Sequence, residues 1–426
     1  MARGSEGRAS ILVVTNSLAY AINHRLHLFE RLVAEGYSLT IAGSGKQADH
    51  EVFNRLGVST IELQVERYRI DVVNDLALFF RIRRLVGKIR PDILHAFTVK
   101  PIFFGRAAIA GLPETARPKK FVGSFTGLGR LFEDDAHVGF RLVRACLGFL
   151  LRRGARGMPQ AITTEAFADL ETLVDDFGLE PEACVVTQGT GVEIAYPLPK
   201  ERQGPVTFLF CGRLLVAKGI LAFLDAARAL LEEGVDARFF VAGTSDPADP
   251  DCINEETLSP FRALDGIKFL GWVDPSDMQD VYARTDVVCL PSMYREGVPR
   301  SLLEGAISEC AFISSAIPGW MEIVGAARSA YRPSRQKAPS TAGAAEHAVV
   351  GGTVIDLDDP AALADVMREM ATSPDATRDM GIAARERLIS AHVSNEHVQS
   401  RYLRAYALAD EDASEMSLQD RSRGVR

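Results

Sequence analysis

The feature that most constrains this chain is an alternation of short apolar runs with segments long enough for a helix. Over the first 195 residues the runs are ILVVT (11–15), SLTIAG (38–43), STIEL (59–63), DILHAF (92–97), KFVGSF (120–125), AITTE (161–165) and CVVTQG (184–189). This pattern is typical of βαβ units, in which helices cover both faces of a parallel sheet. The sequence therefore predicts an α/β domain over residues 1–195.

The alternation begins again after YPLPKERQGP (196–205), a segment rich in Pro, Gly and charge that we interpret as a linker. The next runs are VTFLFCG (206–212), ARFFVAG (237–243), IKFLGW (267–272), DVVCLPS (286–292) and AFISS (311–315). They predict a second domain over 206–380, so the expected fold class is α/β with two facing, doubly wound Rossmann-like domains. We expect helices over 381–410 that can pack back on the first domain. A surface insertion is predicted at 337–350 and a disordered tail at 411–426.

Composition narrows the class of protein. The chain has 426 residues, 47% apolar and 24% charged, and a net charge of −8. Residues 1–200 hold 25 Lys and Arg against 22 Asp and Glu, whereas 201–426 hold 23 against 34, which argues against general nucleic-acid binding. No apolar run approaches the ~20 residues of a membrane span, and the N-terminus lacks the apolar core of a secretory signal. The six cysteines lack CxxC spacing, so we expect a cytoplasmic protein without a zinc site or disulfides.

A first candidate binding site is CGRLLVAKG (211–219). A strand is predicted to end at Cys211, so Arg213 and Lys218 leave its end on either side of a short loop, with Lys218 near the start of a helix. Two cations beside a helix N-terminus suit an anion such as a diphosphate. The alternative is a simple strand-to-helix junction with two solvated cations.

A second candidate is PSMYREGVPRSLLEG (291–305), where a predicted strand leads through a turn into a Leu-rich helix. Pro299 suits the first helical position, where its missing N–H costs little. Glu296 then lies on the turn at the carboxyl end of the strand, and Glu304 lies within the helix. The alternatives are a solvated turn acid for Glu296 and an i,i+4 ion pair with Arg300 for Glu304.

Together, GRLLVAKG and EGVPRSLLEG resemble the paired donor-site motifs of the family 4 glycosyltransferases, retaining enzymes of the GT-B fold. The resemblance extends over roughly residues 10–410 through HRLHLFERL (24–32), DILHAFTVKP (92–101), SFTGLGRLF (124–132) and TQGTGVE (187–193). The chain is most similar to bacterial enzymes that extend polyprenyl-diphosphate-linked sugars for capsule, O-antigen, exopolysaccharide or glycoprotein glycans. This implies a nucleotide-sugar donor, with UDP favoured, and a lipid-linked saccharide acceptor.

The resemblance implies a role for each donor-site residue. Arg213 and Lys218 would bind the donor diphosphate, Glu296 the sugar hydroxyls and Glu304 the nucleotide ribose. The growing charge of a departing nucleoside diphosphate can be stabilised by two cations without a metal, and a carboxylate can accept hydrogen bonds from two vicinal hydroxyls.

The remaining donor-side residues lie in the same motifs or near the expected position of the base. Gly297 and Pro299 belong to the second motif, and Val273 is expected near the base, where the contacts would be mostly main-chain. TNSLAY (15–20) lacks the glycines that often follow the first strand in the family, and SDPADPD (245–251) reads as an acidic loop rather than a metal site.

On the acceptor side the candidates are His24, His95, Lys100, Thr126 and Gly127. His95 is expected at a strand end, either as a catalytic or acceptor-site group or as a packed strand residue. Lys100 could contact a phosphate, and Thr126 and Gly127 lie in a loop or a plain turn. The catalytic base stays open, because the departing phosphate can itself take the acceptor proton.

Two basic segments suggest a membrane surface. Residues 138–157 contain five Arg and no acid among apolar residues, and RIRRLVGKIR (81–90) holds five cations. Such helices suit an anionic inner-leaflet surface, with Arg144, Arg152 and Arg153 as the charges to test. The alternative is a core helix with solvated arginines.

Two other functions are compatible with such a chain. A nucleotide-sugar 2-epimerase would convert the donor without an acceptor, using carboxylates and His. A non-catalytic scaffold of the same fold would bind the donor without turnover. The paired motifs favour transfer.

Overall fold

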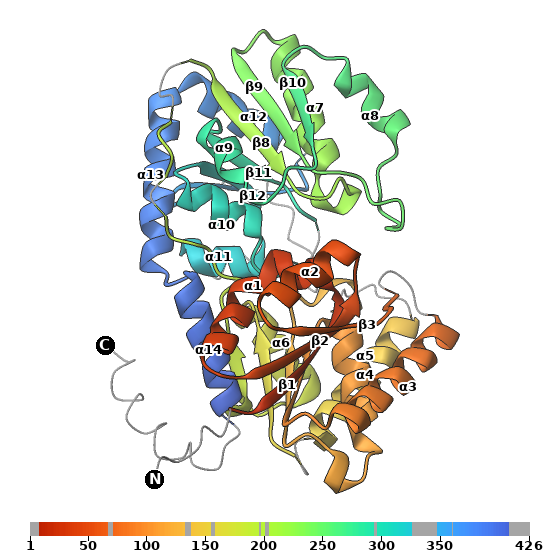
Figure 1. Ribbon diagram of the computed structural model, residues 1–426. Helices are drawn as coiled ribbons and strands as arrows, with labels where there is room; N and C mark the ends of the chain where they lie inside the picture. Colours follow the sequence, from red (N-terminus) through yellow and green to blue (C-terminus); the bar gives the residue numbers. More distant parts are fainter. Residues whose placement is uncertain are drawn as a thin grey trace. The chain divides into compact units, whose positions relative to one another are not determined.

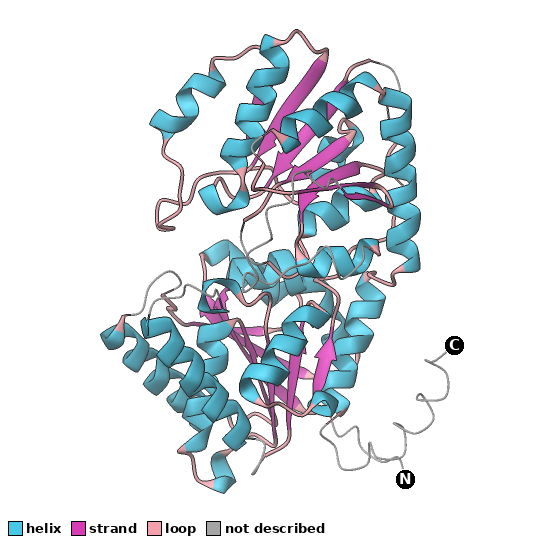
Figure 2. Cartoon of the chain, turned by 180° about the vertical axis from the view of Figure 1, so that it is seen from behind, coloured by secondary structure: helices cyan, strands magenta, loops and turns pink. Residues whose placement is uncertain are grey.

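The computed structural model describes residues 8–66, 71–132, 138–154, 158–195, 197–200, 204–293, 296–325, 347–359 and 361–408. Contacts divide the chain into two compact units. Of the described residues, unit 1 contains those through Thr190 and from Asn395 onward, and unit 2 contains those of Gly191–Ser394. Figures 1 and 2 show that each unit has a sheet covered by helices.

Within the described residues, unit 1 is built on a seven-stranded parallel sheet of order β3-β2-β1-β4-β5-β6-β7. Its strands are β1 (Ser10–Ser17), β2 (Ser38–Ser44), β3 (Ser59–Glu62), β4 (Ile93–Phe97), β5 (Lys120–Ser124), β6 (Gln160–Thr164) and β7 (Cys184–Val186). Its helices are α1 (Leu18–Ala34), α2 (Gln47–Arg55), α3 (Val72–Ile89), α4 (Val99–Ala110), α5 (Val138–Gly154), α6 (Phe167–Phe177) and α14 (Asn395–Ala407), with 3-10 turns η1 (Glu114–Ala116), η2 (Gly129–Phe132) and η3 (Pro181–Ala183).

The alternation of side chains along β1 explains why both faces of this sheet are covered. Leu12 and Val14 join a buried cluster with α3, α4, α5 and α6, whereas Ile11 and Val13 join one with α1, α2 and α14. Successive residues of a strand point to opposite faces, so a strand buried on both sides must be apolar throughout.

Unit 2 repeats the plan, with strand order β10-β9-β8-β11-β12-β14-β13 among the residues described. Its strands are β8 (Val206–Cys211), β9 (Ala237–Ala242), β10 (Ile267–Gly271), β11 (Val287–Leu290), β12 (Ala311–Ser315), β13 (His347–Val349) and β14 (Gly352–Ile355). Its helices are α7 (Ile220–Glu232), α8 (Glu255–Arg262), α9 (Met278–Ala283), α10 (Arg300–Ile307), α11 (Pro318–Val324), α12 (Ala362–Thr372) and α13 (Pro374–Ser390), with the 3-10 turn η4 (Val216–Lys218). Among the described strands of this unit, β13 alone pairs antiparallel, with β14.

The predicted fold class is confirmed, and every predicted apolar run overlaps a strand. At the described end of the predicted surface insertion (337–350), His347–Val349 forms the edge strand β13, and Ala348 and Val350 are exposed. Its signal was weak, since a three-residue strand beside small residues has no clear period. Residues 337–346 and the predicted tail at 411–426 lie outside the described residues.

Side-chain hydrogen bonds fasten the segment interpreted as a linker (196–205) to the rest of unit 2. Lys200 Nζ donates to the carbonyls of Thr285 (2.7 Å) and Glu309 (2.9 Å). Arg378 Nη2 donates to the carbonyl of Gly204 at 3.0 Å. The division between the units falls slightly earlier in the chain, between Thr190 and Gly191. None of the described helices is long and apolar enough to cross a bilayer.

Candidate active site

The site forms at the carboxyl ends of β8 and β11, which are neighbours in the sheet of unit 2. The strand order reverses here, because β9 and β10 lie on one side of β8 and β12 lies beyond β11. In doubly wound sheets, ligands bind at such a switch point. The two motifs singled out in the sequence follow these two strands.

Glycine allows the two strand ends to approach closely. Gly219, at φ +78°, separates η4 from α7, and a Cβ on it would lie 2.0 Å from the carbonyl oxygen of Pro291. A side chain at this position would therefore clash with the end of β11 and would also strain the backbone. The loop that carries Lys218 is thereby held against the loop that carries Glu296.

Lys218 and Glu296 form an ion pair that joins the two motifs. Lys218 Nζ lies 2.5 Å from Glu296 Oε2, with 17% and 12% of the two side chains exposed. Ser292 Oγ donates to the other oxygen, Oε1, at 2.7 Å. Both predicted residues are therefore brought together and largely shielded from solvent.

Arg213 leaves the end of β8 and pairs with Asp249. Arg213 Nη1 lies 2.7 Å from Asp249 Oδ2, and 47% of the Arg213 side chain but only 6% of the Asp249 side chain is exposed. Asp249 belongs to the acidic stretch 245–251, which was interpreted as a plain loop. Across the described ranges, no three His, Cys, Asp or Glu side chains gather as a metal ion would require.

Glu304 lies in the second turn of α10 and has two donors. Arg300 Nε donates to Oε1 at 2.5 Å, so the i,i+4 pair considered as an alternative does form, and Tyr282 Oη donates to Oε2 at 3.1 Å. Burial, followed by the charge of Glu304, raises the pKa of the Cys211 thiol to about 12. Lys218 and Arg300 act on the same thiol in the opposite direction, so charges from both motifs converge on the end of β8.

Of the remaining donor-side candidates, Gly297 and Pro299 lie beside Glu296 and Arg300 in the chain, whereas Val273 follows β10. Gly297 and Pro299 are buried, and α10 begins at Arg300, one residue after the expected start, so Pro299 occupies the N-cap position. Val273 packs against the core of unit 2 after β10, beside an exposed Trp272. Because β9 separates β10 from β8, nothing in the described contacts brings Val273 to the charged residues.

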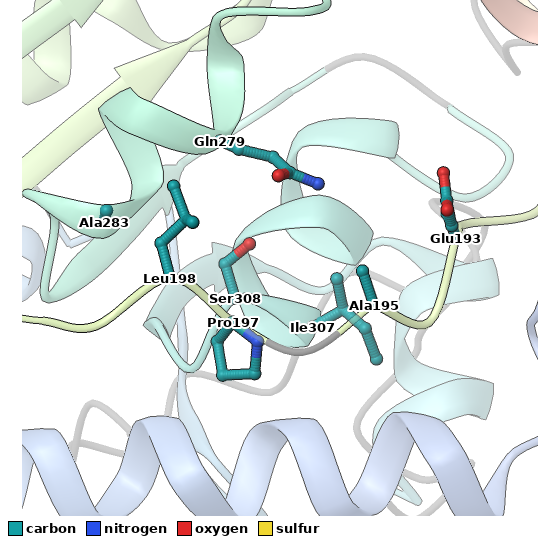
Figure 3. A pocket seen from close by; sticks show the side chains of 8 residues that line it. All are labelled: Glu193, Ala195, Pro197, Leu198, Gln279, Ala283, Ile307 and Ser308. Carbon is teal, nitrogen blue, oxygen red and sulfur yellow. The ribbon is translucent and has the colours of Figure 1, made fainter.

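A small cavity in unit 2 lies away from these residues (Figure 3). It is lined by Glu193, Ala195, Pro197, Leu198, Gln279, Ala283, Ile307 and Ser308. Ile307 and Ser308 lie at the carboxyl end of α10, whereas the turn with Glu296 precedes its amino end. The cavity therefore reflects how the linker packs on α9 and α10.

The prediction that His95 is a catalytic group at a strand end does not fit the structure. His95 lies in the middle of β4 with no exposed surface, and its ring nitrogens lie 2.7 Å from Tyr406 Oη and 2.7 Å from Ser124 Oγ. Burial, followed by the charge of Arg25, holds the pKa of His95 well below its usual range. A neutral imidazole with both nitrogens engaged fastens α14 to the sheet, which is the packed-residue alternative.

The other acceptor-side candidates lie on several different elements of unit 1. Lys100 Nζ pairs with Asp75 Oδ1 at 2.7 Å, which connects α4 to α3. Thr126 and Gly127 follow β5, with Gly127 at φ +107°. The His24 ring centroid lies 5.0 Å from that of Tyr20 on α1. The described contacts do not join these side chains into one cluster.

Sequence reasoning missed a buried arginine in unit 1. Arg25 has no exposed surface, its Nη2 lies 2.6 Å from Glu165 Oε1, and its guanidinium lies over the rings of Phe97 and Tyr402. A signal was present, because Arg25 lies seven residues after Leu18 on the apolar stripe of α1. A charge on such a stripe predicts a buried partner.

Two family models match the chain, one within each unit. A model described as Glycosyl transferase 4-like matches residues 12–152, and one described as Glycosyl transferases group 1 matches residues 205–373. The uncharacterized glycosyltransferase MJ1607 of Methanocaldococcus jannaschii is 31% identical over 116 residues, which span 27% of this chain and only 28% of that relative.

Solved structures resemble the chain over nearly its whole length. Anabaena HepE in complex with UDP and glucose matches with a TM-score of 0.68 and 14% identity, covering 94% of this chain and 100% of that one. Sucrose-phosphate synthase from Thermosynechococcus elongatus matches with a TM-score of 0.68 and 16% identity, covering 94% and 98%. At such identities the likeness shows the fold alone, which is the GT-B fold. The chain thus has two Rossmann-like domains of the GT-B fold, and a glycosyl transferase model matches part of each.

Proposed function

We propose that this protein transfers a hexose or N-acetylhexosamine from a nucleoside diphosphate sugar, UDP being the favoured nucleotide, to a polyprenyl-diphosphate-linked saccharide. The observation that carries the proposal is the ion pair between Lys218 and Glu296 at the switch point of unit 2. It brings a phosphate-binding cation next to a carboxylate suited to sugar hydroxyls. The match to a group 1 glycosyl transferase model over the same residues supports this assignment.

In the proposed reaction the bond between the sugar anomeric carbon and the diphosphate oxygen breaks while the acceptor oxygen bonds to that carbon. Arg213 and Lys218 stabilise the negative charge that develops on the departing diphosphate, as preorganised charges do in a shielded site, and no metal is needed for that step. Glu296 accepts hydrogen bonds from sugar hydroxyls, and Glu304 accepts them from the ribose. The departing phosphate takes the acceptor proton, so the new bond forms on the face the diphosphate leaves and the configuration is retained.

The acceptor side of the proposal places unit 1 on an anionic membrane surface. Large apolar side chains are exposed on α3 at Val72, Val73, Leu76 and Phe80 and on α5 at Leu142 and Phe149. Exposed cations accompany them, Arg81, Arg84 and Lys88 on α3 and Arg141 and Arg152 on α5. An apolar stripe flanked by cations suits the boundary between acyl chains and anionic headgroups.

Arg144 and Arg153 are unsuitable for charge reversal in a test of membrane docking. Arg144 lies 2.8 Å from Asp176 and over the ring of Phe132, so it contributes to the fold, and the side chain of Arg153 lies outside the described residues. Reversing Arg84 and Lys88 together should abolish sedimentation with anionic vesicles. Reversing two exposed cations of unit 2, Arg238 and Lys268, serves as the charge-matched control. Unchanged sedimentation of the double variant would refute membrane docking through α3.

The transfer reaction is tested in two steps. Thermal shift with UDP-, GDP- and dTDP-sugars identifies the nucleotide, and each stabilising donor is then incubated with and without a lipid-linked saccharide. Product on the lipid supports transfer. Isomerised donor without any acceptor would indicate the epimerase alternative, and tight donor binding with no product on any lipid would indicate the scaffold alternative.

A further inference from the structure

The acidic loop Thr244–Ile253 lies beside the loop that carries Arg213, and main-chain hydrogen bonds join the two loops. Leu214 N donates to the Thr244 carbonyl at 3.1 Å, and Ile253 N donates back to the Leu214 carbonyl at 3.2 Å. Val216 N donates to the Asp251 carbonyl at 3.1 Å. These main-chain bonds fix the position of the acidic loop beside the end of β8.

Asp249 is the residue of this loop that reaches Arg213, and its carboxylate is itself held in place. Its Oδ1 accepts the N–H of Asp251 at 3.1 Å, and its own N–H donates to the Asp246 carbonyl at 2.9 Å. The second oxygen, Oδ2, takes Arg213 Nη1 at 2.7 Å. The buried carboxylate is therefore a fixed anchor, and the partly exposed guanidinium is the flexible partner.

We infer that Asp249 is a positioning residue that orients Arg213 toward the diphosphate of the donor, an inference that rests on the proposed function. An arginine side chain loses rotamer freedom when a ligand fixes it. An anchor that has already fixed the guanidinium removes part of that cost from binding. The ion pair itself adds little to folding, because its arginine is partly exposed to solvent.

Loss of the Asp249 charge changes diphosphate affinity in opposite directions if Asp249 positions Arg213 and if it competes with the diphosphate. If Asp249 orients Arg213, loss of its charge weakens diphosphate binding. If it instead competes with the diphosphate for the guanidinium, the same change tightens binding. The burial of Asp249 favours positioning. Both of its carboxylate oxygens are bonded to protein groups, and the exposed part of the Arg213 guanidinium faces solvent, where a diphosphate can reach it.

The test measures UDP affinity by calorimetry for wild type, Asp249→Asn, Arg213→Ala and the double variant. Asp249→Asn should weaken UDP binding by about 5- to 20-fold, below the roughly 30-fold that ordering the whole arginine side chain would cost. It should have no further effect in the Arg213→Ala background. Asp249→Glu, which keeps the charge, should recover part of the affinity. Asp246→Asn is the control in the same loop and should bind UDP like wild type.

Each other outcome overturns the inference. Unchanged or tighter binding by Asp249→Asn would exclude positioning. A loss that persists in the Arg213→Ala background, or an equal loss in Asp246→Asn, would mean that the loop rather than the contact is responsible. If wild type binds none of UDP, GDP, ADP and dTDP, the proposed function itself fails and the inference with it. That failure is distinguishable because it is seen with the wild-type protein, before any variant is measured.

Discussion

Glu296→Gln offers the sharpest test of the proposed site, because it should separate nucleotide binding from sugar transfer. The substitution keeps the shape of the side chain and removes its charge, so Lys218 loses an anion 2.5 Å from Nζ while only 17% of its side chain is exposed. An unpaired, partly buried cation costs about 1–3 kcal/mol, below the 3–5 kcal/mol of a wholly buried pair. At about 2–4 °C per kcal/mol, unit 2 should melt about 2–12 °C lower.

UDP should reverse this loss, because its diphosphate supplies the missing anion. A ligand stabilises the folded state by RT ln(1 + [L]/Kd), so a given excess of UDP should raise the Tm of Glu296→Gln more than that of wild type. Turnover at saturating donor should nevertheless fall on the order of 100-fold, as when one preorganised polar contact is removed. Lys218→Met is the matched variant and should lose both the stabilisation by UDP and the turnover.

Differential scanning fluorimetry with and without UDP, together with single-turnover transfer, measures both quantities. A smaller Tm gain for Glu296→Gln than for wild type would show that Lys218 does not meet the diphosphate. Near-normal transfer by this variant would show that Glu296 does not meet the sugar. Either result refutes the assigned roles.

Three further predictions concern neighbours of the site and of the unit 1 core. Tyr282→Phe removes a donor to Glu304, so discrimination between UDP and 2′-deoxy-UDP should fall about 3- to 10-fold in competition binding. Tyr406→Phe leaves a buried nitrogen of His95 unpaired, so chemical unfolding should show a loss of about 1–3 kcal/mol with no change in transfer at saturating donor. The pKa of His95 is lower in the folded than in the unfolded protein, so wild-type stability should decline below about pH 6.5, by at most about 1.4 kcal/mol per pH unit, and His95→Gln should lack that component. A loss of transfer without a loss of stability in Tyr406→Phe would restore a catalytic role for His95.

The sequence predicted those features that local periodicity and motif spacing determine. Strands buried on both faces are continuous apolar runs, so both sheets could be predicted, and Lys218 and Glu296 stood out because charged residues follow strand ends. Asp249 did not, because its contact with Arg213 joins positions 36 residues apart in a loop without periodicity. The sequence left His95 open between a catalytic group and a packed residue for a similar reason, since its partner Tyr406 lies 311 residues away in α14.

The ion pairs of Arg213 and Lys218 predict the order in which nucleotide and sugar bind in the proposed reaction. Each cation that would meet the diphosphate already has a carboxylate partner, Asp249 for Arg213 and Glu296 for Lys218. The two carboxylates differ in what else holds them: a main-chain N–H of its own loop fixes Asp249, whereas the hydroxyl of Ser292 holds Glu296. If a diphosphate replaces the carboxylate at Lys218, Glu296 gains an oxygen that can accept a sugar hydroxyl. Nucleotide binding would therefore complete the sugar site, and a free hexose should bind measurably only after UDP is bound.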